Sequence, residues 1–445
     1  MMQTATANPI VRKIWWITLI VQSLIGFTNG MYLYTYGPYF YEKFGTAVEP
    51  GYAILLMTIL LGLRQGILAL LEVPTGALAD TIGRVNVVII SWIARLVFFS
   101  SLAAIWFCTS VAAAFAWGVI ASIAFALSYA LFNGAFSAWC VETLKEKAPE
   151  VNYGWLSSRF FSYRAAAEII GGLLAICLYL KGLPYWGFLI AALASFAGLN
   201  YVMGSMEETS SLSFLNIRQV QISAITRRIG EIIGKSVQVC KQTKVLFWLI
   251  LSYGAFMFLL NLVGYLWPVY LKAKFGNLET FGRDWILIMI TTQLLMVASS
   301  RFLAWLNGRW TKTGGVKAHL NGFRKIFFWF TLLSACSILL LSADTAFHFM
   351  DKYIFPLAVI LLVMSFGFIG PAFETLVNAY IPAESAQYRS TIMSAGSMLR
   401  SFLILLFAIP SGGSSGETTP IGWAIPATML LVACITANHF MRRKK

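Results

Sequence analysis

Charged residues are scarce in this chain of 445 residues, where they make up only 11% of the total. Soluble globular domains carry about 25% charged residues, so this scarcity excludes an ordinary water-soluble fold. Hydrophobic residues make up 59% of the chain, and its mean hydropathy is +0.74. The composition therefore predicts a protein whose solvent is lipid.

Residues that bind metals or carry redox chemistry are also few. The chain has three histidines and six cysteines, which are dispersed and form no Cys-x-x-Cys pair. It also lacks a phosphate-binding loop and a nucleophile elbow. We therefore expect no metal site, disulfide framework or cofactor, and we do not expect an enzyme or a nucleotide-driven pump.

Long apolar runs are present throughout. A helix needs about 20 apolar residues to cross a bilayer. That criterion predicts an all-α integral membrane protein with twelve spans, at residues 14–41, 51–79, 86–108, 111–141, 157–180, 183–204, 244–271, 284–306, 323–342, 353–381, 390–412 and 420–440. The third and fourth spans almost touch, so only a tight turn can join them.

The net charge of +15 is unevenly placed. Few basic residues fall in loops that we expect to face outward: Lys43, Lys181, Lys272, Lys274, Arg283 and Lys352. Most others lie in loops or ends predicted to be cytosolic, which places both termini inside. The basic tail 442–445 is then a topology anchor and not a nucleic-acid patch. We expect a monomer in the plasma (inner) membrane whose partners are lipid and a small-molecule substrate.

The chain repeats itself weakly. Lys43-Phe44-Gly45 recurs as Lys274-Phe275-Gly276, and Ala135-Phe136 recurs as Ala372-Phe373. The offsets of 231 and 237 residues are close to half the chain, which favours two six-helix repeats. We predict bundles at 1–204 and 244–445, joined by a cytosolic linker at 205–243 that contains an amphipathic helix.

A charged turn follows the second span. It reads Gly76-Ala77-Leu78-Ala79-Asp80-Thr81-Ile82-Gly83-Arg84. Gly76 allows close helix approach, Asp80 can accept backbone hydrogen bonds at a helix N-terminus, and Gly83 permits a tight turn. The pattern resembles the loop between helices 2 and 3 of major facilitator superfamily transporters, although Val85 replaces a second basic residue. The segment 388–394 resembles the start of helix 11 in the same family.

This resemblance implies the twelve-helix fold of that superfamily and transport by alternating access. It assigns Gly76, Asp80, Gly83 and Arg84 to a conformational switch. It also implies that helices 1 and 7 line a central cavity, which makes Asn29, Tyr36, Asn261 and Tyr265 candidate substrate residues; ordinary packing is the alternative for each. The arginine motif of proton-coupled members is missing from span four, so proton coupling is not carried over.

Ionisable residues inside spans are functional candidates because each is unfavourable in lipid by about 2.5–3.5 kcal/mol. By resemblance, helices 2 and 11 pack together, so Glu72 and Arg400 form a candidate pair. Arg164 and Glu168 are one turn apart and can neutralise each other. Glu374 lies beside Pro371 and either titrates or bonds to freed backbone. The remaining candidates are Arg64 and Arg95, of which Arg95 is better explained as structural.

These observations favour a secondary active transporter of a small organic solute. The arginines within the spans tilt the expected solute toward an anion or a zwitterion. An exporter of amphipathic, drug-like compounds is the alternative, and a transporter-like sensor or assembly partner is a distant one. Coupling to a proton or sodium gradient stays open, with Glu72, Glu168 and Glu374 as the candidate proton carriers.

Overall fold

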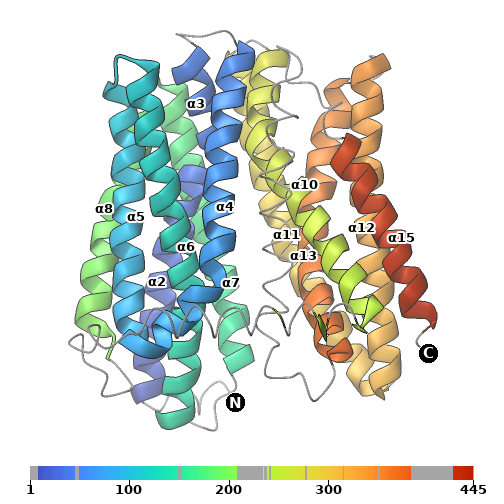
Figure 1. The fold of residues 1–445 in the computed structure, drawn as a ribbon. Helices are drawn as coiled ribbons and strands as arrows, with labels where there is room; N and C mark the ends of the chain where they lie inside the picture. Colours follow the sequence, from blue (N-terminus) through green and yellow to red (C-terminus); the bar gives the residue numbers. More distant parts are fainter. Residues whose placement is uncertain are drawn as a thin grey trace. The chain divides into compact units, whose positions relative to one another are not determined.

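The computed structural model describes residues 9–45, 50–147, 153–207, 242–275, 278–313, 315–347, 351–381 and 424–443, together with positions 234, 238 and 239. Within these ranges the chain is helical and contains no strand. The helices are α2 (Pro9–Leu33), α3 (Tyr36–Gly45), α4 (Pro50–Ile82), α5 (Arg84–Phe107), α6 (Val111–Lys147), α7 (Tyr153–Leu180), α8 (Pro184–Ser205), α10 (Lys244–Phe275), α11 (Leu278–Thr313), α12 (Gly315–Phe347), α13 (Asp351–Tyr380) and α15 (Ala424–Arg443) (Figure 1).

Eleven helical segments within the described residues are long and apolar enough to cross a membrane. Each corresponds to one of the predicted spans, and the predicted span 390–412 lies outside the described residues. The expected tight turn between the third and fourth spans is also present, because α5 ends at Phe107 and α6 begins at Val111. The all-α membrane architecture predicted from hydropathy is thus confirmed.

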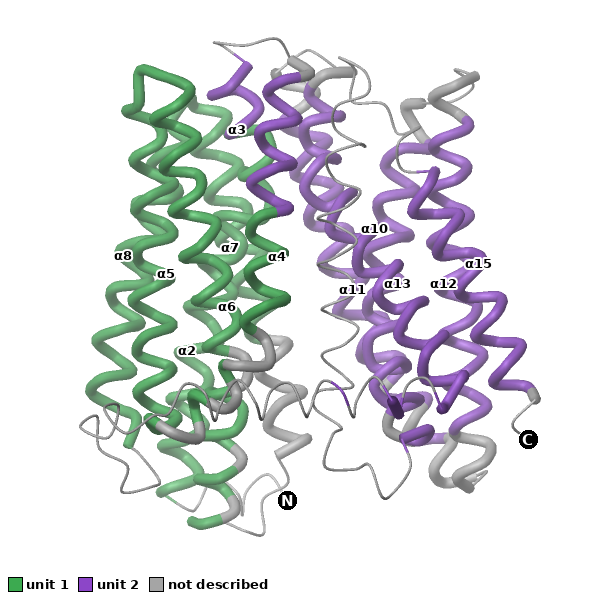
Figure 2. Tube along the Cα trace, viewed as in Figure 1, with its two compact units in different colours: residues 1–39, 63–227 green, residues 40–62, 228–445 purple. Residues whose placement is uncertain are grey.

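Contacts divide the chain into two compact units (Figure 2). Unit 1 comprises Met1–Tyr39 and Leu63–Arg227, and unit 2 comprises Phe40–Gly62 and Arg228–Lys445. The predicted repeats at 1–204 and 244–445 stay a prediction. Most of the linker at 205–243, including its amphipathic helix, lies outside the described residues.

Glycines bring α2 and α7 into backbone contact within unit 1. A Cβ atom on Gly26 would lie 2.1 Å from the carbonyl oxygen of Arg164, and one on Gly30 would lie 2.1 Å from that of Glu168. Gly171 on α7 is equally close to the carbonyl oxygen of Phe27, at 2.1 Å. Small residues drive helix association in membranes by permitting this approach. The Gly26-x-x-x-Gly30 pair therefore fixes α2 against α7.

The first span is broken at Tyr34 and Thr35, which separate α2 from α3. Pro38 has no N–H, and its ring clashes with the carbonyl of the residue four positions earlier, which is Tyr34. The Thr35 hydroxyl also donates to the Met31 carbonyl at 2.7 Å, a bond that bends helices. The helix resumes when the Tyr39 amide donates to the Thr35 carbonyl at 2.9 Å. The span was predicted, but this break was not.

Candidate functional site in unit 1

Arg64 on α4 is only 1% exposed, which makes it the most deeply buried cation among the described residues. Its guanidinium carbon lies 4.5 Å from the ring centre of Phe125 on α6. The rings of Tyr32 on α2 and Tyr36 on α3 are 5.4 and 5.5 Å away. We call these four residues the Arg64 cluster.

Helical spacing explains why these rings converge. Tyr32 and Tyr36 are four residues apart on either side of the α2–α3 break, and their ring centres are 5.1 Å apart. Phe98 on α5 contacts Tyr32 and Phe125, each at 5.1 Å. A desolvated cation–π contact contributes about 2 kcal/mol, which is close to the cost of an arginine in lipid of about 2.5–3.5 kcal/mol. Several rings can therefore hold a charged arginine at this depth.

Arg95 on α5 is also buried, but hydrogen bonds bind it to α2. Its Nε donates to the Thr28 hydroxyl at 2.9 Å, and its Nη2 donates to the Ile25 carbonyl at 3.2 Å. Nη2 also makes a short hydrogen bond to Asn29 Oδ1. These contacts support the structural interpretation of Arg95. They also place Asn29, a candidate cavity residue, against α5 in this structure.

The charged turn is well defined at Gly83, which lies between α4 and α5 with φ 94° and ψ 148°. This positive φ favours glycine, as the motif predicts. Arg84 reaches α6, where its Nη2 lies 3.0 Å from Glu142 Oε1 and its Nε lies 3.5 Å from Oε2. The sequence analysis did not predict a role for Glu142. The sequence marks it only as an acidic residue close to the basic end of a span. Gly76 and Asp80 belong to α4, but the Asp80 side chain and the packing around Gly76 are outside what the structure describes.

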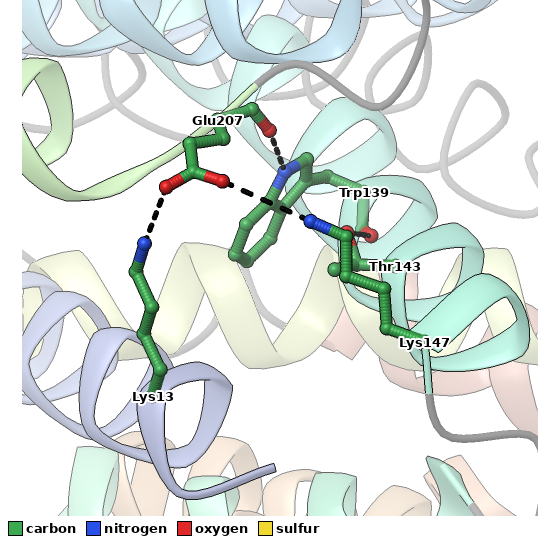
Figure 3. A network of polar contacts seen from close by, with 5 residues as sticks. All are labelled: Lys13, Trp139, Thr143, Lys147 and Glu207. Carbon is green, nitrogen blue, oxygen red and sulfur yellow. Dashed lines mark hydrogen bonds and ion pairs between the residues drawn. The ribbon is translucent and has the colours of Figure 1, made fainter. Parts of the chain in front are cut away.

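A second polar network closes the same, predicted cytosolic end of unit 1 (Figure 3). Glu207, just after α8, lies 2.5 Å from Lys13 of α2 and 3.8 Å from Lys147 of α6. Its carbonyl accepts a hydrogen bond from Trp139 Nε1 at 2.9 Å. The hydrogen bond and charge of Lys13, together with the charge of Lys147, lower the pKa of the Glu207 carboxyl. This network joins three helices and was not anticipated from the sequence.

Residues on α7 and in unit 2 complete the predicted set. Arg164 and Glu168 are half-buried on α7, at the crossing with α2. Asn261 donates to the Met257 carbonyl at 2.7 Å, and Tyr265 is buried on α10. Glu374 is exposed on α13. Arg400 and the side chain of Glu72 lie outside the described residues, so their pairing stays a prediction.

Long apolar helices, buried intramembrane arginines and polar networks at the helix ends describe a multi-pass membrane protein. Among the described residues, no group of histidine, cysteine or carboxylate side chains could hold a metal ion.

Comparison with known proteins identifies the family. A sequence model described as Major Facilitator Superfamily matches residues 18–408, and the chain belongs to that family. It is therefore a membrane transport protein and not an enzyme. No curated protein matches.

Solved structures show the same fold at low identity. A D-xylose-proton symporter matches with a TM-score of 0.66 and 13% identity, covering 96% of this chain and 97% of the other. A peptide transporter crystallised with sulfate gives 0.71 and 13%, covering 97% and 94%. A human organic anion transporter gives 0.58 and 17%, covering 97% and 100%. The predicted major facilitator fold is thus confirmed, and the match does not extend to the substrate.

Proposed function

We propose that this protein is a secondary active transporter that moves a small organic anion or zwitterion by alternating access. The observation that carries the proposal is the Arg64 cluster, a fully buried cation within a membrane span. An ionisable residue buried in a span is costly in lipid, so it is a candidate for a substrate or ion site by default. The guanidinium also matches a carboxylate in shape and charge.

The surrounding rings suit such a role. Tyr32 and Tyr36 contact Arg64 from both sides of the α2–α3 break. Rearrangement at this break would change how closely the rings enclose the guanidinium. A carboxylate that enters when they separate replaces weak cation–π contacts with a charge-assisted hydrogen bond.

The test is uptake by purified protein in proteoliposomes, with a panel of monocarboxylates, amino acids and their matched neutral amides. We expect faster uptake of carboxylates than of the matched amides, and an uptake rate that is at least tenfold lower in Arg64→Gln. Arg64→Lys keeps the charge but loses the bidentate geometry, so we expect an intermediate rate. Arg283→Gln is the matched control, because Arg283 is exposed and pairs with its neighbour Asp284 at 3.2 Å. Equal uptake of amides and carboxylates would contradict the anionic preference.

Gradient coupling is tested with the three candidate proton carriers. We propose Glu374 first, because no basic residue lies within a turn or two of it on α13, whereas Arg164 can hold Glu168 ionised. Replacing a carrier with Gln should abolish uptake driven by a pH gradient and spare exchange at equilibrium. If the Glu72, Glu168 and Glu374 variants all retain full dependence on the gradient, sodium coupling or facilitated diffusion is the better account.

A further inference from the structure

Basic side chains gather within unit 2 where α10 begins and α15 ends, at the predicted cytosolic side. The two helices pack against each other (Figure 1). Lys244 is the first residue of α10, and His439 and Arg442 lie near the end of α15. All three residues are exposed, and we call them the α10/α15 basic cluster. His439 and Arg442 are three residues apart, so they share one face of α15.

One aromatic ring brings the basic side chains of the two helices together. Lys244 Nζ lies 5.9 Å from the centre of the Phe440 ring, and the centre of the His439 ring lies 5.7 Å from the same point. Trp248 on α10 stacks on Phe440, with ring centres 6.4 Å apart and an interplanar angle of 10°. Because Phe440 packs between α10 and α15, it positions Lys244 and His439 around a shared side chain.

The protein does not neutralise this cluster with its own described carboxylates. Among the residues that the structure describes, no Asp or Glu side chain forms an ion pair with a member of the cluster. At the predicted cytosolic end of unit 1, in contrast, Lys13 and Lys147 both contact Glu207. The basic cluster of unit 2 therefore presents positive charge that attracts an anion from outside the protein.

Exposed apolar surface continues from the cluster into the membrane span. The exposed residues of α15 recur every three or four positions and thus form one stripe along the helix. They are Ile425, Thr428, Val432, Ile435, His439 and Arg442. On α10, the exposed Phe247 lies one turn after Lys244. Both helices are long and apolar enough to cross a membrane, so this stripe lies against acyl chains.

These two surfaces match the two parts of one ligand. We infer that the α10/α15 basic cluster binds the headgroup of an anionic phospholipid, whose acyl chains lie along the exposed stripe of α15. Lys244 and Arg442 supply positive charge to the phosphate, and the His439 ring supplies an N–H donor. A small free anion would use the basic cluster alone, whereas a lipid also uses the apolar stripe.

This site is distinct from the proposed transport site and from a topology anchor. The Arg64 cluster lies in unit 1, so the inference goes beyond the proposed function and does not depend on it. A topology anchor requires only positive charge on the correct side of the membrane. A lipid site requires these side chains at these positions, and a lipid that contacts both helices stabilises the folded protein by binding to it.

The test uses the purified full-length protein in a neutral detergent. Native mass spectrometry counts bound lipids, and thermal unfolding is followed in parallel. The probes are dioleoyl phosphatidylglycerol, dioleoyl phosphatidylcholine and glycerol 3-phosphate. The cluster variant combines Lys244→Gln with Arg442→Gln. The control combines Lys13→Gln with Lys147→Gln, which removes the same number of charges at the predicted cytosolic end of unit 1.

We expect the parent to bind phosphatidylglycerol more tightly than phosphatidylcholine and to unfold at a higher temperature with it. Phosphatidylglycerol should bind at least about tenfold more weakly to the cluster variant, and about fivefold more weakly to the single variant Arg442→Gln at the exposed helix end. The control should bind it as the parent does.

Three results would overturn the inference. Equal weakening in the cluster variant and the control would show a general attraction to surface charge. Unchanged phosphatidylglycerol binding in Arg442→Gln and in the cluster variant would exclude the site. Equal stabilisation by glycerol 3-phosphate would show that the cluster recognises phosphate alone, and the lipid assignment would fail.

Discussion

The first and seventh spans end in similar sequences but have different backbones. Both carry a proline before a Lys-Phe-Gly sequence, Pro38 in one and Pro268 in the other. The chain breaks before Pro38 to give α2 and α3, whereas α10 runs unbroken from Lys244 to Phe275 through Pro268. A proline in a membrane helix therefore does not by itself decide whether the helix is broken.

The neighbours of each proline explain the difference. Thr35 precedes Pro38 by three residues, and its hydroxyl donates a hydrogen bond to the Met31 carbonyl at 2.7 Å. Tyr265 stands at the matching place before Pro268, and its phenol is too long to bond to its own backbone in this way. Gly37 adds further freedom next to Pro38, where α10 has Trp267. Two adjacent perturbations break the first helix, while the seventh tolerates one.

The largest expected effect comes from the glycines that hold α2. A Cβ at Gly30 would lie 2.1 Å from the Glu168 carbonyl oxygen, whereas one at Gly264 on α10 meets nothing within 4 Å. Gly30→Ala should therefore destabilise the fold by about 1–3 kcal/mol, as overpacking does, and Gly264→Ala should be nearly neutral. Thermal unfolding in detergent compares the two, and an equal fall would contradict the close α2–α7 contact.

The next effect concerns Arg95, whose hydrogen bonds hold α2 against α5. Among the described residues, no arginine is seen to bind α10 in the same way. Arg95→Lys keeps a charge but cannot supply the same set of hydrogen bonds, so Thr28 or Asn29 loses a partner. The expected loss of stability is about 1–3 kcal/mol. Arg283→Lys serves as an exposed control and should stay within about 0.5 kcal/mol of the parent. Equal stability of Arg95→Lys and the parent would argue against this clamp.

A smaller effect is expected from the prolines themselves. Pro38→Ala restores a backbone donor, and together with Thr35→Val it should favour a continuous first helix and slow transport several-fold. Pro268→Ala should change the rate less, because α10 is already continuous. Initial uptake rates measure both. A greater fall in the uptake rate for Pro268→Ala would contradict the view that only the first helix depends on its break.

The smallest effect involves pH and Glu207. Its folded pKa is depressed by Lys13, so its contribution to stability is present above the unfolded pKa of about 4.3 and is lost as pH falls through the folded pKa. The parent should unfold at a slightly higher temperature than Glu207→Gln at neutral pH, and the difference should vanish in acid. A difference that grows on acidification would contradict this assignment.

Sequence reasoning captured the spans because hydrophobic length depends on the bilayer and not on tertiary contacts. The Gly83 turn was also predictable from local sequence, because a positive φ strongly favours glycine over other residues. The break at Tyr34–Thr35 was not, because Pro38 and Pro268 look alike until the hydrogen bond of Thr35 is known. Arg64 was named a candidate because a charged residue is unfavourable in lipid, but its aromatic partners come from three helices, and no sequence pattern specifies how these helices are rotated against one another.

The contact between Glu42 Oε1 on α3 and Lys272 Nζ on α10, which lie 2.7 Å apart, also escaped prediction, since residues far apart in the sequence meet through an exposed pair with no motif. It nevertheless offers the most direct test of the proposed alternating access, because a link between Glu42 and Lys272 would prevent α3 and α10 from separating. In a cysteine-free background, Glu42→Cys with Lys272→Cys is joined by a short reducible cross-linker, and counterflow uptake of a solute transported by the parent is measured. Lys13→Cys with Glu207→Cys is the matched pair within unit 1. The account predicts that joining the first pair stops uptake and that reduction restores it, while joining the second pair leaves uptake near the parent rate. Unchanged uptake with the first pair joined would contradict it.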